Sequence, residues 1–338
     1  MPTEKKILKT VFLIQLISSF LVVVGHYTAS ALNYTDHFWI LALNQLSRYG
    51  TVLLTIATGF ITAYSFDRKQ PRFAPYIMGK IKFIFVPFVL AGILYHYLLF
   101  GGLPKDLPAF LNILLGKTGG HLYYIFMLFQ YYLFAYLFRN LITKRNIVYW
   151  LLPLMGMQYL YIHVLHHEWL GLTTRHFLPT WIFTFYLGHT LYWYREKLFA
   201  CLQQPLLLAG GTSLVLLSAV LFVLSDTMYV AVHLRFVLAT ALSFLLMLFL
   251  GQRIVDRLPI AFRKGFTYFI YLFHSAFITM FNRFAEKFGG DLEWIYDNVW
   301  LTLTGLAVTY LSTCVFALTI VRLMKRNRTS QSVTSVQA

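Results

Sequence analysis

Four ionisable side chains stand inside long apolar runs of the sequence: His26, Arg48, His121 and Arg235. A histidine can take and return a proton near neutral pH, because its unperturbed pKa is about 6.5. An arginine can stabilise a developing oxyanion, and keeping one deep in a bilayer costs about 2.5–3.5 kcal/mol on insertion scales. Because four different runs each supply one such residue in the half that we predict to face outward, the sequence predicts one outward-facing polar pocket that holds bases and cations.

Each of these residues also has a simpler explanation. A single histidine in a helix is more often a structural hydrogen-bond donor, and Arg48 or Arg235 can snorkel toward the outer headgroups. Convergence from several spans at one level favours the functional interpretation. Other histidines and an acidic residue are weaker candidates: Asp226, His233, His189, and His274 beside Tyr268 and Tyr271. The histidines that solvation in a loop explains are His163, His166 and His167, which have only Glu168 as a nearby carboxylate.

The composition identifies the elements that must position these residues. Hydrophobic residues make up 59% of the 338 residues and charged residues only 12%, whereas a soluble domain has about 25% charged residues. The apolar runs last about twenty residues, the length that a membrane-spanning helix needs, and not the roughly ten of a barrel strand. The sequence therefore predicts an all-α integral membrane protein.

Ten candidate spans follow from the apolar runs, and the basic residues orient them. The spans are 10–31, 44–66, 79–100, 120–139, 147–164, 177–194, 206–225, 228–250, 266–285 and 299–322. With both termini in the cytoplasm, 21 of the 28 basic residues fall on the inner face and 5 in outer loops, as the positive-inside rule requires. The net charge of +16 then reflects topology and anionic lipid, and no recognition motif indicates nucleic acid.

The chain reads as one membrane domain, 1–326, followed by a tail rich in Ser, Thr and Gln, 327–338, which we expect to be disordered. Cys201 and Cys314 lie at different levels of the predicted topology and show no metal-type spacing, so we expect neither a disulfide nor a zinc site. Residues 29–31, Ala-Ser-Ala, resemble a signal-peptide cleavage site, but the polar residues and the length of the first run favour a retained helix.

The stretch "GKIKFIFVPF" places Lys80 and Lys82 at the inner start of the third span. Ordinary positive-inside anchoring explains them, and so does a docking place for the phosphates of a cytoplasmic donor, because ammonium groups bind phosphate as point charges. A glycine-rich phosphate loop is absent from the sequence, which disfavours an ATP-driven transporter. A GxSxG elbow is absent as well.

Six stretches together resemble the membrane acyltransferase 3 family over nearly the whole chain. They are "QLISSFLVVVGH", "RYGTVLLTIATGF", "GKIKFIFVPF", "GGHLYYIFMLFQYYLF", "FTFYLGHTL" and "TYFIYLFHSAF". The resemblance implies transfer of an acyl group, acetyl by default, from cytoplasmic acyl-CoA to hydroxyls of an extracellular or cell-envelope carbohydrate. It also implies a multi-pass protein of the cell membrane, with membrane lipid and a carbohydrate acceptor as partners and with no metal.

The resemblance assigns roles residue by residue. His26 matches the first-helix histidine and would act as general base or acyl carrier. Arg48 matches the basic residue that begins the second-helix motif, and His121 matches the histidine of the motif "GGHLYYIFMLFQYYLF". The last motif carries His274. Beyond the motif matches, our mechanistic hypothesis is that Arg48 and Arg235 stabilise the oxyanion and that Lys80 and Lys82 bind the phosphates of acyl-CoA. The chain departs from the family at Gln15, where the first-helix arginine is expected, and at Phe83 in the inner motif.

Two other kinds of protein fit a polar pocket in a ten-helix bundle. An exporter of polysaccharide or lipid-linked sugar should show inverted repeats and broken helices in matching halves, and the sequence shows neither. A sensory or scaffolding protein has little reason to keep two arginines and two histidines at one depth. Tyr123 and Tyr124, beside His121, are candidates for stacking on a sugar, although an interfacial aromatic belt explains them equally well.

Overall fold

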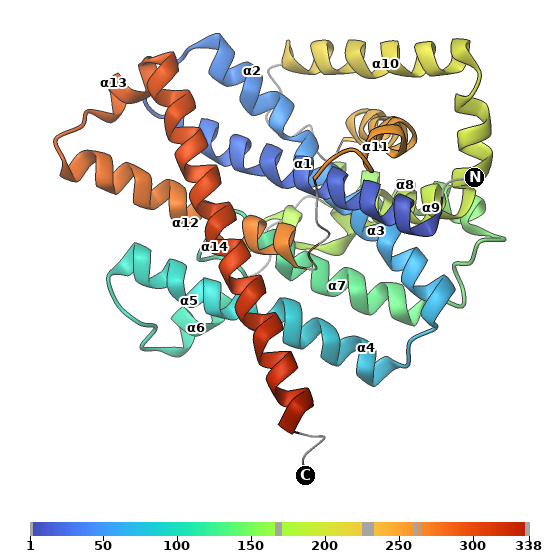
Figure 1. Ribbon diagram of the computed structural model, residues 1–338, viewed down its shortest axis with the longest axis horizontal. Helices are drawn as coiled ribbons and strands as arrows, with labels where there is room; N and C mark the ends of the chain where they lie inside the picture. The colour runs from blue at the N-terminus through green and yellow to red at the C-terminus, as the bar shows by residue number, and fades with distance from the viewer. Residues whose placement is uncertain (1–2, 166–170, 225–232, 260–262, 264, 335–338) are drawn as a thin grey trace. The chain divides into compact units, whose positions relative to one another are not determined.

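A computed structural model describes residues 3–165, 171–224, 233–259, 263 and 265–334. The chain divides into two compact units: unit 1 comprises Met1–Ser18 and Arg48–Pro259, and unit 2 comprises Ser19–Ser47 and Ile260–Ala338. Every regular element in the described ranges is helical (Figure 1). The all-α prediction is confirmed to that extent.

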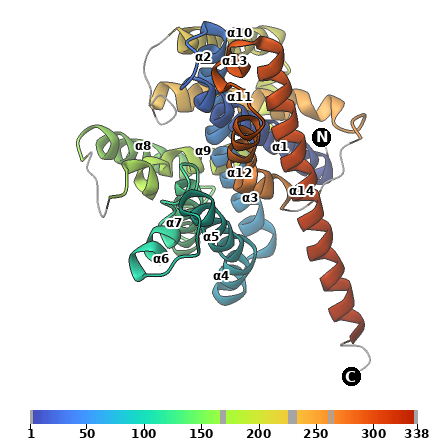
Figure 2. The ribbon, with the colours of Figure 1, turned by 90° about the vertical axis from the view of Figure 1, so that its left-hand side faces the viewer.

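Helices carry both units, and α1 (Glu4–Ala31) contributes to each. Unit 1 contains α3 (Tyr49–Lys69), α4 (Phe73–Lys80), a π-helical turn η1 (Ile81–Phe85), α5 (Val86–Phe100), α6 (Leu107–Leu114), α7 (Tyr123–Leu137), α8 (Ile147–His163), the short 3₁₀ turns η2 (Thr174–His176) and η3 (Leu178–Thr180), α9 (Ile182–Leu202), α10 (Pro205–Val223) and α11 (Leu234–Ile254). Unit 2 contains α2 (Phe38–Ser47), α12 (Phe266–Lys287), α13 (Leu292–Asp297) and α14 (Val299–Thr334), and α12 and α14 lie side by side (Figure 2).

Each of the ten predicted spans contains a helix in its described part, but only six helical stretches of the described chain are long and apolar enough to cross a bilayer. These are Glu4–Ala31, Phe38–Lys69, Phe73–Phe100, Pro205–Val223, Leu234–Ile254 and Val299–Lys325. Of the others, α7 has only 15 residues and α8 only 17, which is short for a hydrocarbon core of about 30 Å. Six candidate spans are therefore observed; the count of ten and the cytoplasmic termini stay predictions.

Two apolar helices present nearly all of their side chains to the outside. Only 6% of the apolar stretch of α10 is buried, and only 17% of that of α14. A contiguous apolar surface of this size is rare on soluble proteins, because water around it is unfavourable. These helices therefore require the hydrocarbon of a bilayer as their surroundings.

Two helices begin with short polar caps. Asp106 precedes α6 and accepts a hydrogen bond from the Ala109 amide at 2.7 Å. Asn298 precedes α14 and accepts from the amides of Trp300 and Leu301 at 3.0 and 3.1 Å. Such caps satisfy amide groups that the first turn of a helix leaves without a partner, and each typically contributes about 1 kcal/mol.

Two element boundaries differ from the sequence prediction. The predicted span 44–66 contains an interruption at Arg48, since α2 ends at Ser47 and α3 begins at Tyr49. The final helix, α14, continues to Thr334, so the structure has helix at 327–334, where the sequence predicts a disordered tail. Serine, threonine and glutamine are weak or moderate helix formers that extend a helix already nucleated upstream.

The core of unit 1 is the packing of α3 against α9, which glycine makes possible. A Cβ on Gly59 would overlap the carbonyl oxygen of Phe185, and a Cβ on Gly188 would overlap that of Ile56. The two backbones therefore approach as closely as the small-residue contacts of membrane helices allow. Phe60 and Phe185, both fully buried, extend this contact along the two helices.

We predict that Gly188→Ala destabilises the protein, because the added methyl group would have to displace the backbone of α3. Overpacking typically costs about 1–3 kcal/mol, which exceeds the gain of roughly 1 kcal/mol in helix propensity from Gly to Ala. Thermal unfolding in detergent measures the effect. Gly210→Ala in α10 is the control, because its Cβ would meet no described atom within 4 Å. Equal melting temperatures for the two variants would contradict the prediction.

Candidate functional site

In unit 2 the structure brings together two of the histidines that the sequence singles out. The ring of His26, half-buried on α1, lies 4.9 Å from the ring of His274, measured between centroids, and the rings are tilted by 50°. His274 on α12 is fully buried, and its Nδ1 lies 2.6 Å from the carbonyl oxygen of Tyr271. Because a carbonyl oxygen can only accept, Nδ1 donates this hydrogen bond.

The backbone around His26 is fixed by a residue that the sequence analysis did not select. Asn44 on α2 donates from Nδ2 to the carbonyl oxygen of Gly25, at 2.9 Å, and to the hydroxyl of Thr28, at 3.0 Å. Gly25 has no side chain at the contact with α2, where a Cβ would collide with the hydroxyl of Ser47. An amide in an apolar run is a signal for such a role, because a buried polar group needs partners.

A second hydrogen-bonded group joins α1, α12 and α13 within unit 2. Asn282 donates to the hydroxyl of Ser30 at 3.0 Å and accepts from the hydroxyl of Tyr296 at 2.6 Å. The ring of Tyr296 packs against those of Tyr27 and Tyr34, each at 5.5 Å between centroids. This group restrains the last turn of α1, one turn beyond His26.

The other predicted catalytic residues belong to unit 1. His121 is buried in the turn before α7, with its ring 5.1 Å from that of Tyr95. Arg48 is half-buried immediately before α3. Arg235 is exposed in the first turn of α11, because that helix begins at Leu234 rather than near residue 228. The described position of Arg235 suits a snorkelling residue, and the common pocket of His26, Arg48, His121 and Arg235 stays a prediction.

The two lysines of the inner motif occupy different surroundings. Pro87 cannot donate a backbone hydrogen bond to the turn before it, and the helix there widens into the π-helical turn Ile81–Phe85. Lys80, at the end of α4, places its Nζ 3.6 Å from the ring centroid of Tyr132 and 5.2 Å from that of Tyr76. Lys82, inside the π-helical turn, is exposed and lies over the neighbouring Phe83 ring at 5.8 Å.

Besides His274, three other histidines considered in the sequence analysis fall on described residues. His189 is buried in α9, and its Nε2 lies 2.8 Å from the hydroxyl of Tyr131. The rings of His163 and His233 lie 5.3 Å apart. The candidates Asp226, His166, His167 and Glu168 lie outside the described residues. Among the residues that are described, no group of three or more His, Cys, Asp or Glu side chains is arranged to hold a metal ion.

The tyrosines proposed for sugar stacking are already engaged. Tyr124 is buried. The ring of Tyr123 stacks on Trp181, with 6.4 Å between centroids, and the guanidinium of Arg175 lies 5.2 Å from its centre. Both rings therefore serve packing in the described structure, which favours their structural interpretation.

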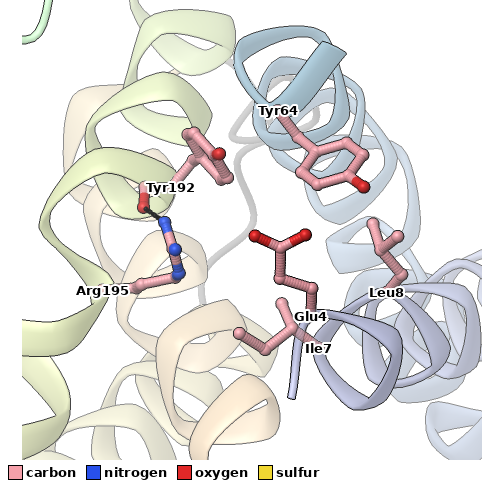
Figure 3. A pocket seen from close by; sticks show the side chains of 6 residues that line it. All are labelled: Glu4, Ile7, Leu8, Tyr64, Tyr192 and Arg195. Atoms are coloured by element: carbon pink, nitrogen blue, oxygen red, sulfur yellow. Dashed lines mark hydrogen bonds between the residues drawn. The ribbon is translucent and has the colours of Figure 1, made fainter. Parts of the chain in front are cut away.

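A shallow hollow opens in unit 1 beside the start of α1 (Figure 3). The carboxylate of Glu4 points into it between Tyr64 and Tyr192, and Arg195 donates to the carbonyl oxygen of Tyr192. Arg68 forms an ion pair with Glu4. The free space is about 210 Å³ with open solvent included, below the roughly 300–1,000 Å³ of a ligand pocket. This hollow is an ion-paired surface and is too small for a substrate.

The segment 173–181 is fastened across α7 through Gln130. The side chain of Gln130 donates to the carbonyl oxygen of His176 at 2.7 Å and accepts from the amide of Leu178 at 3.1 Å. The Nδ1 of His176 lies 3.0 Å from the hydroxyl of Thr173. Partial burial lowers the pKa of His176 below its ordinary value of 6.5, and the charges of Arg175 and Lys117 lower it further.

Comparison with protein families gives one match. The model of the acyltransferase 3 family, described as an acyltransferase domain, matches residues 12–321. No curated protein and no solved structure matches the chain significantly.

We predict that acid weakens the fold through His176. Because the folded protein binds this proton less well than the unfolded chain, the stabilising contribution is complete above about pH 6.5 and is lost as the pH falls through the lowered pKa. The melting temperature should therefore drop less between about pH 7.5 and pH 5 in His176→Asn than it does in the unmodified protein. An equal fall in both proteins would show that the acid sensitivity arises elsewhere.

Proposed function

The chain belongs to the acyltransferase 3 family, and on that basis we propose that it moves an acyl group, acetyl by default, from cytoplasmic acyl-CoA to a hydroxyl of an extracellular or cell-envelope carbohydrate. Family membership makes the protein an acyltransferase, and its six apolar helical stretches make it a multi-pass membrane protein. The donor, the acetyl group, the carbohydrate acceptor and the cell membrane as location are the proposed part.

The pair of His26 and His274 is the observation that supports this proposal most strongly. A general base must be positioned and must keep a lone pair available at working pH. His26 is half-buried, so its ring combines partial exposure with fixed packing against His274. Asn44 restrains the backbone carbonyl immediately before it. This combination of a restrained base and an accessible edge suits abstraction of a proton from a hydroxyl group.

The reaction then follows from the proposed roles. His26 takes the proton of the acceptor hydroxyl as its oxygen attacks the thioester carbonyl carbon, and an oxyanion develops on the carbonyl oxygen. Collapse of this intermediate breaks the carbon–sulfur bond, and the leaving CoA thiolate receives the proton that His26 carried. Of the two proposed oxyanion partners we prefer Arg48, because it is half-buried whereas Arg235 is exposed at the start of α11.

The proposed donor site lies at the inner motif. Lys80, held over the rings of Tyr132 and Tyr76, is better restrained than the exposed Lys82. Glutamine at position 15 lacks the bidentate fork of the arginine that the family resemblance places there. The donor site therefore lacks one bidentate contact at position 15.

Reconstituted liposomes separate the proposed enzyme from an exporter. Labelled acetyl-CoA is supplied to the purified protein with and without a carbohydrate acceptor on the opposite side of the bilayer. Transfer of the label from acetyl-CoA to the carbohydrate supports acyl transfer. Movement of carbohydrate across the bilayer without any label would support the exporter and would overturn the proposed function.

We predict that His26→Ala lowers the turnover number by about 10²- to 10⁴-fold, the usual contribution of a positioned general base. The liposome assay measures the loss, and circular dichroism with thermal unfolding verifies the fold. His96→Ala is the matched control, since His96 is also half-buried on an apolar helix and packs on Phe100. A His26→Ala protein that folds and retains full transfer would exclude His26 as the base.

We predict that Asn44→Ala lowers kcat by roughly tenfold with little change in the KM for the donor, because it releases the backbone at Gly25 without touching the donor site. The substitution also removes the hydrogen bonds of Asn44 to the Gly25 carbonyl oxygen and to the Thr28 hydroxyl, each of which contributes about 0.5–1.5 kcal/mol to the free energy of unfolding. Steady-state kinetics at saturating donor measures the split. A change in KM alone would assign Asn44 to donor binding instead.

A further inference from the structure

An aromatic cluster in unit 1 holds two cations from different elements. Lys80 of α4 lies over Tyr132 and Tyr76, at 3.6 and 5.2 Å. Arg139, two residues beyond the end of α7, places its guanidinium carbon 3.6 Å from the centre of the Tyr136 ring. The rings of Tyr76 and Tyr136 lie 5.2 Å apart, so a continuous row of aromatic contacts joins the two cations.

Arg139 differs from Arg68 and Arg195 in that one of its guanidinium nitrogens makes no hydrogen bond within the described chain. Its Nη1 is buried and has no hydrogen-bond partner within the described part of the chain. By contrast, Arg68 pairs with Glu4, and Arg195 bonds the carbonyl oxygen of Tyr192. A buried charged donor without a partner is unfavourable, so an anion that supplies acceptor oxygens would stabilise Arg139 there.

The chemistry of the cluster suits a phosphate group as that anion. A guanidinium presents parallel N–H groups that match two oxygens of a carboxylate or a phosphate, and the second positive charge, the ammonium of Lys80, favours the more highly charged phosphate. Turning Arg139 toward such a ligand breaks no hydrogen bond that Nη1 makes within the described chain, because it makes none there. The rings of Tyr132 and Tyr136 hold the Lys80 ammonium and the Arg139 guanidinium at the same aromatic cluster.

We propose that Arg139, together with Lys80, binds a phosphate group of the nucleotide part of the acyl-CoA donor. The assignment rests on the proposed function, and it gives the donor site an arginine where the inner motif has Phe83. Arg139 supplies the bidentate contact and Lys80 supplies the second charge. The headgroup of an anionic lipid offers the same chemistry, so the experiment must distinguish these two sources of phosphate.

Binding of unacylated CoA to the purified full-length protein in phosphatidylcholine nanodiscs tests the site without any acyl transfer. We expect Arg139→Gln to weaken binding by roughly tenfold or more, as the loss of a charge-assisted bidentate contact does. The CoA affinity of Arg139→Lys should lie between those of the unmodified protein and Arg139→Gln, because lysine keeps the charge and lacks the bidentate guanidinium. Arg145→Gln is the matched control, since Arg145 is exposed in the same predicted inner segment.

Several outcomes would overturn the assignment. One is equal CoA affinity for Arg139→Gln and Arg145→Gln when thermal unfolding shows that both variants are folded. This result would overturn the assignment even if acyl transfer is intact. A second experiment measures binding of phosphatidic acid in nanodiscs that contain this lipid. If Arg139→Gln loses lipid binding while its CoA affinity is unchanged, the site belongs to a lipid headgroup. Arg139-dependent CoA binding by a protein that transfers no acyl group would keep this site and refute the proposed function instead.

Discussion

The close approach of α3 and α9 is the contact on which unit 1 depends. Gly59 and Gly188 allow two backbones to touch where any Cβ would overlap a carbonyl oxygen. In a bilayer, helices gain little from burying apolar side chains against one another, so dispersion contacts at such short range are a main source of association. Arg48 precedes α3 and His189 lies on α9 one residue beyond Gly188, so both side chains are placed by this packing. Their positions follow from small residues that do no chemistry themselves.

Unit 2 uses a different means to restrain its histidine. Gly25 permits α1 and α2 to meet, and the amide of Asn44 then bonds the carbonyl oxygen of Gly25 and the hydroxyl of Thr28. One turn further on, Asn282 links Ser30 to Tyr296. Polar bonds of this kind specify the rotation of a helix, whereas apolar packing alone permits several. A base with a fixed rotation about the helix axis is more useful to a reaction than one that is only buried.

Much of the fold was predictable because lipid leaves a chain few choices. Backbone groups in hydrocarbon must be bonded within the segment, so each apolar run had to form a helix, and each does. The ends of helices were less predictable: α11 begins at Leu234, and this exposes Arg235, which the hydropathy pattern placed inside the span. The pairing of His26 with His274 could not be read from spacing, because the two residues lie on α1 and α12, far apart in the chain. Arg139 looked like ordinary anchoring charge, and only its contact with Tyr136 and its buried nitrogen separate it from its neighbours.

The π-helical turn Ile81–Phe85 changes the directions in which side chains on its two sides point. A π-helical turn accommodates one residue more than the corresponding α-helical turn, so positions on its two sides are rotated by about 100° relative to an unbroken α-helix. Lys80, before the turn, lies over the ring of Tyr132, whereas Lys82, inside the turn, is exposed. Two lysines that are close in sequence therefore have different surroundings.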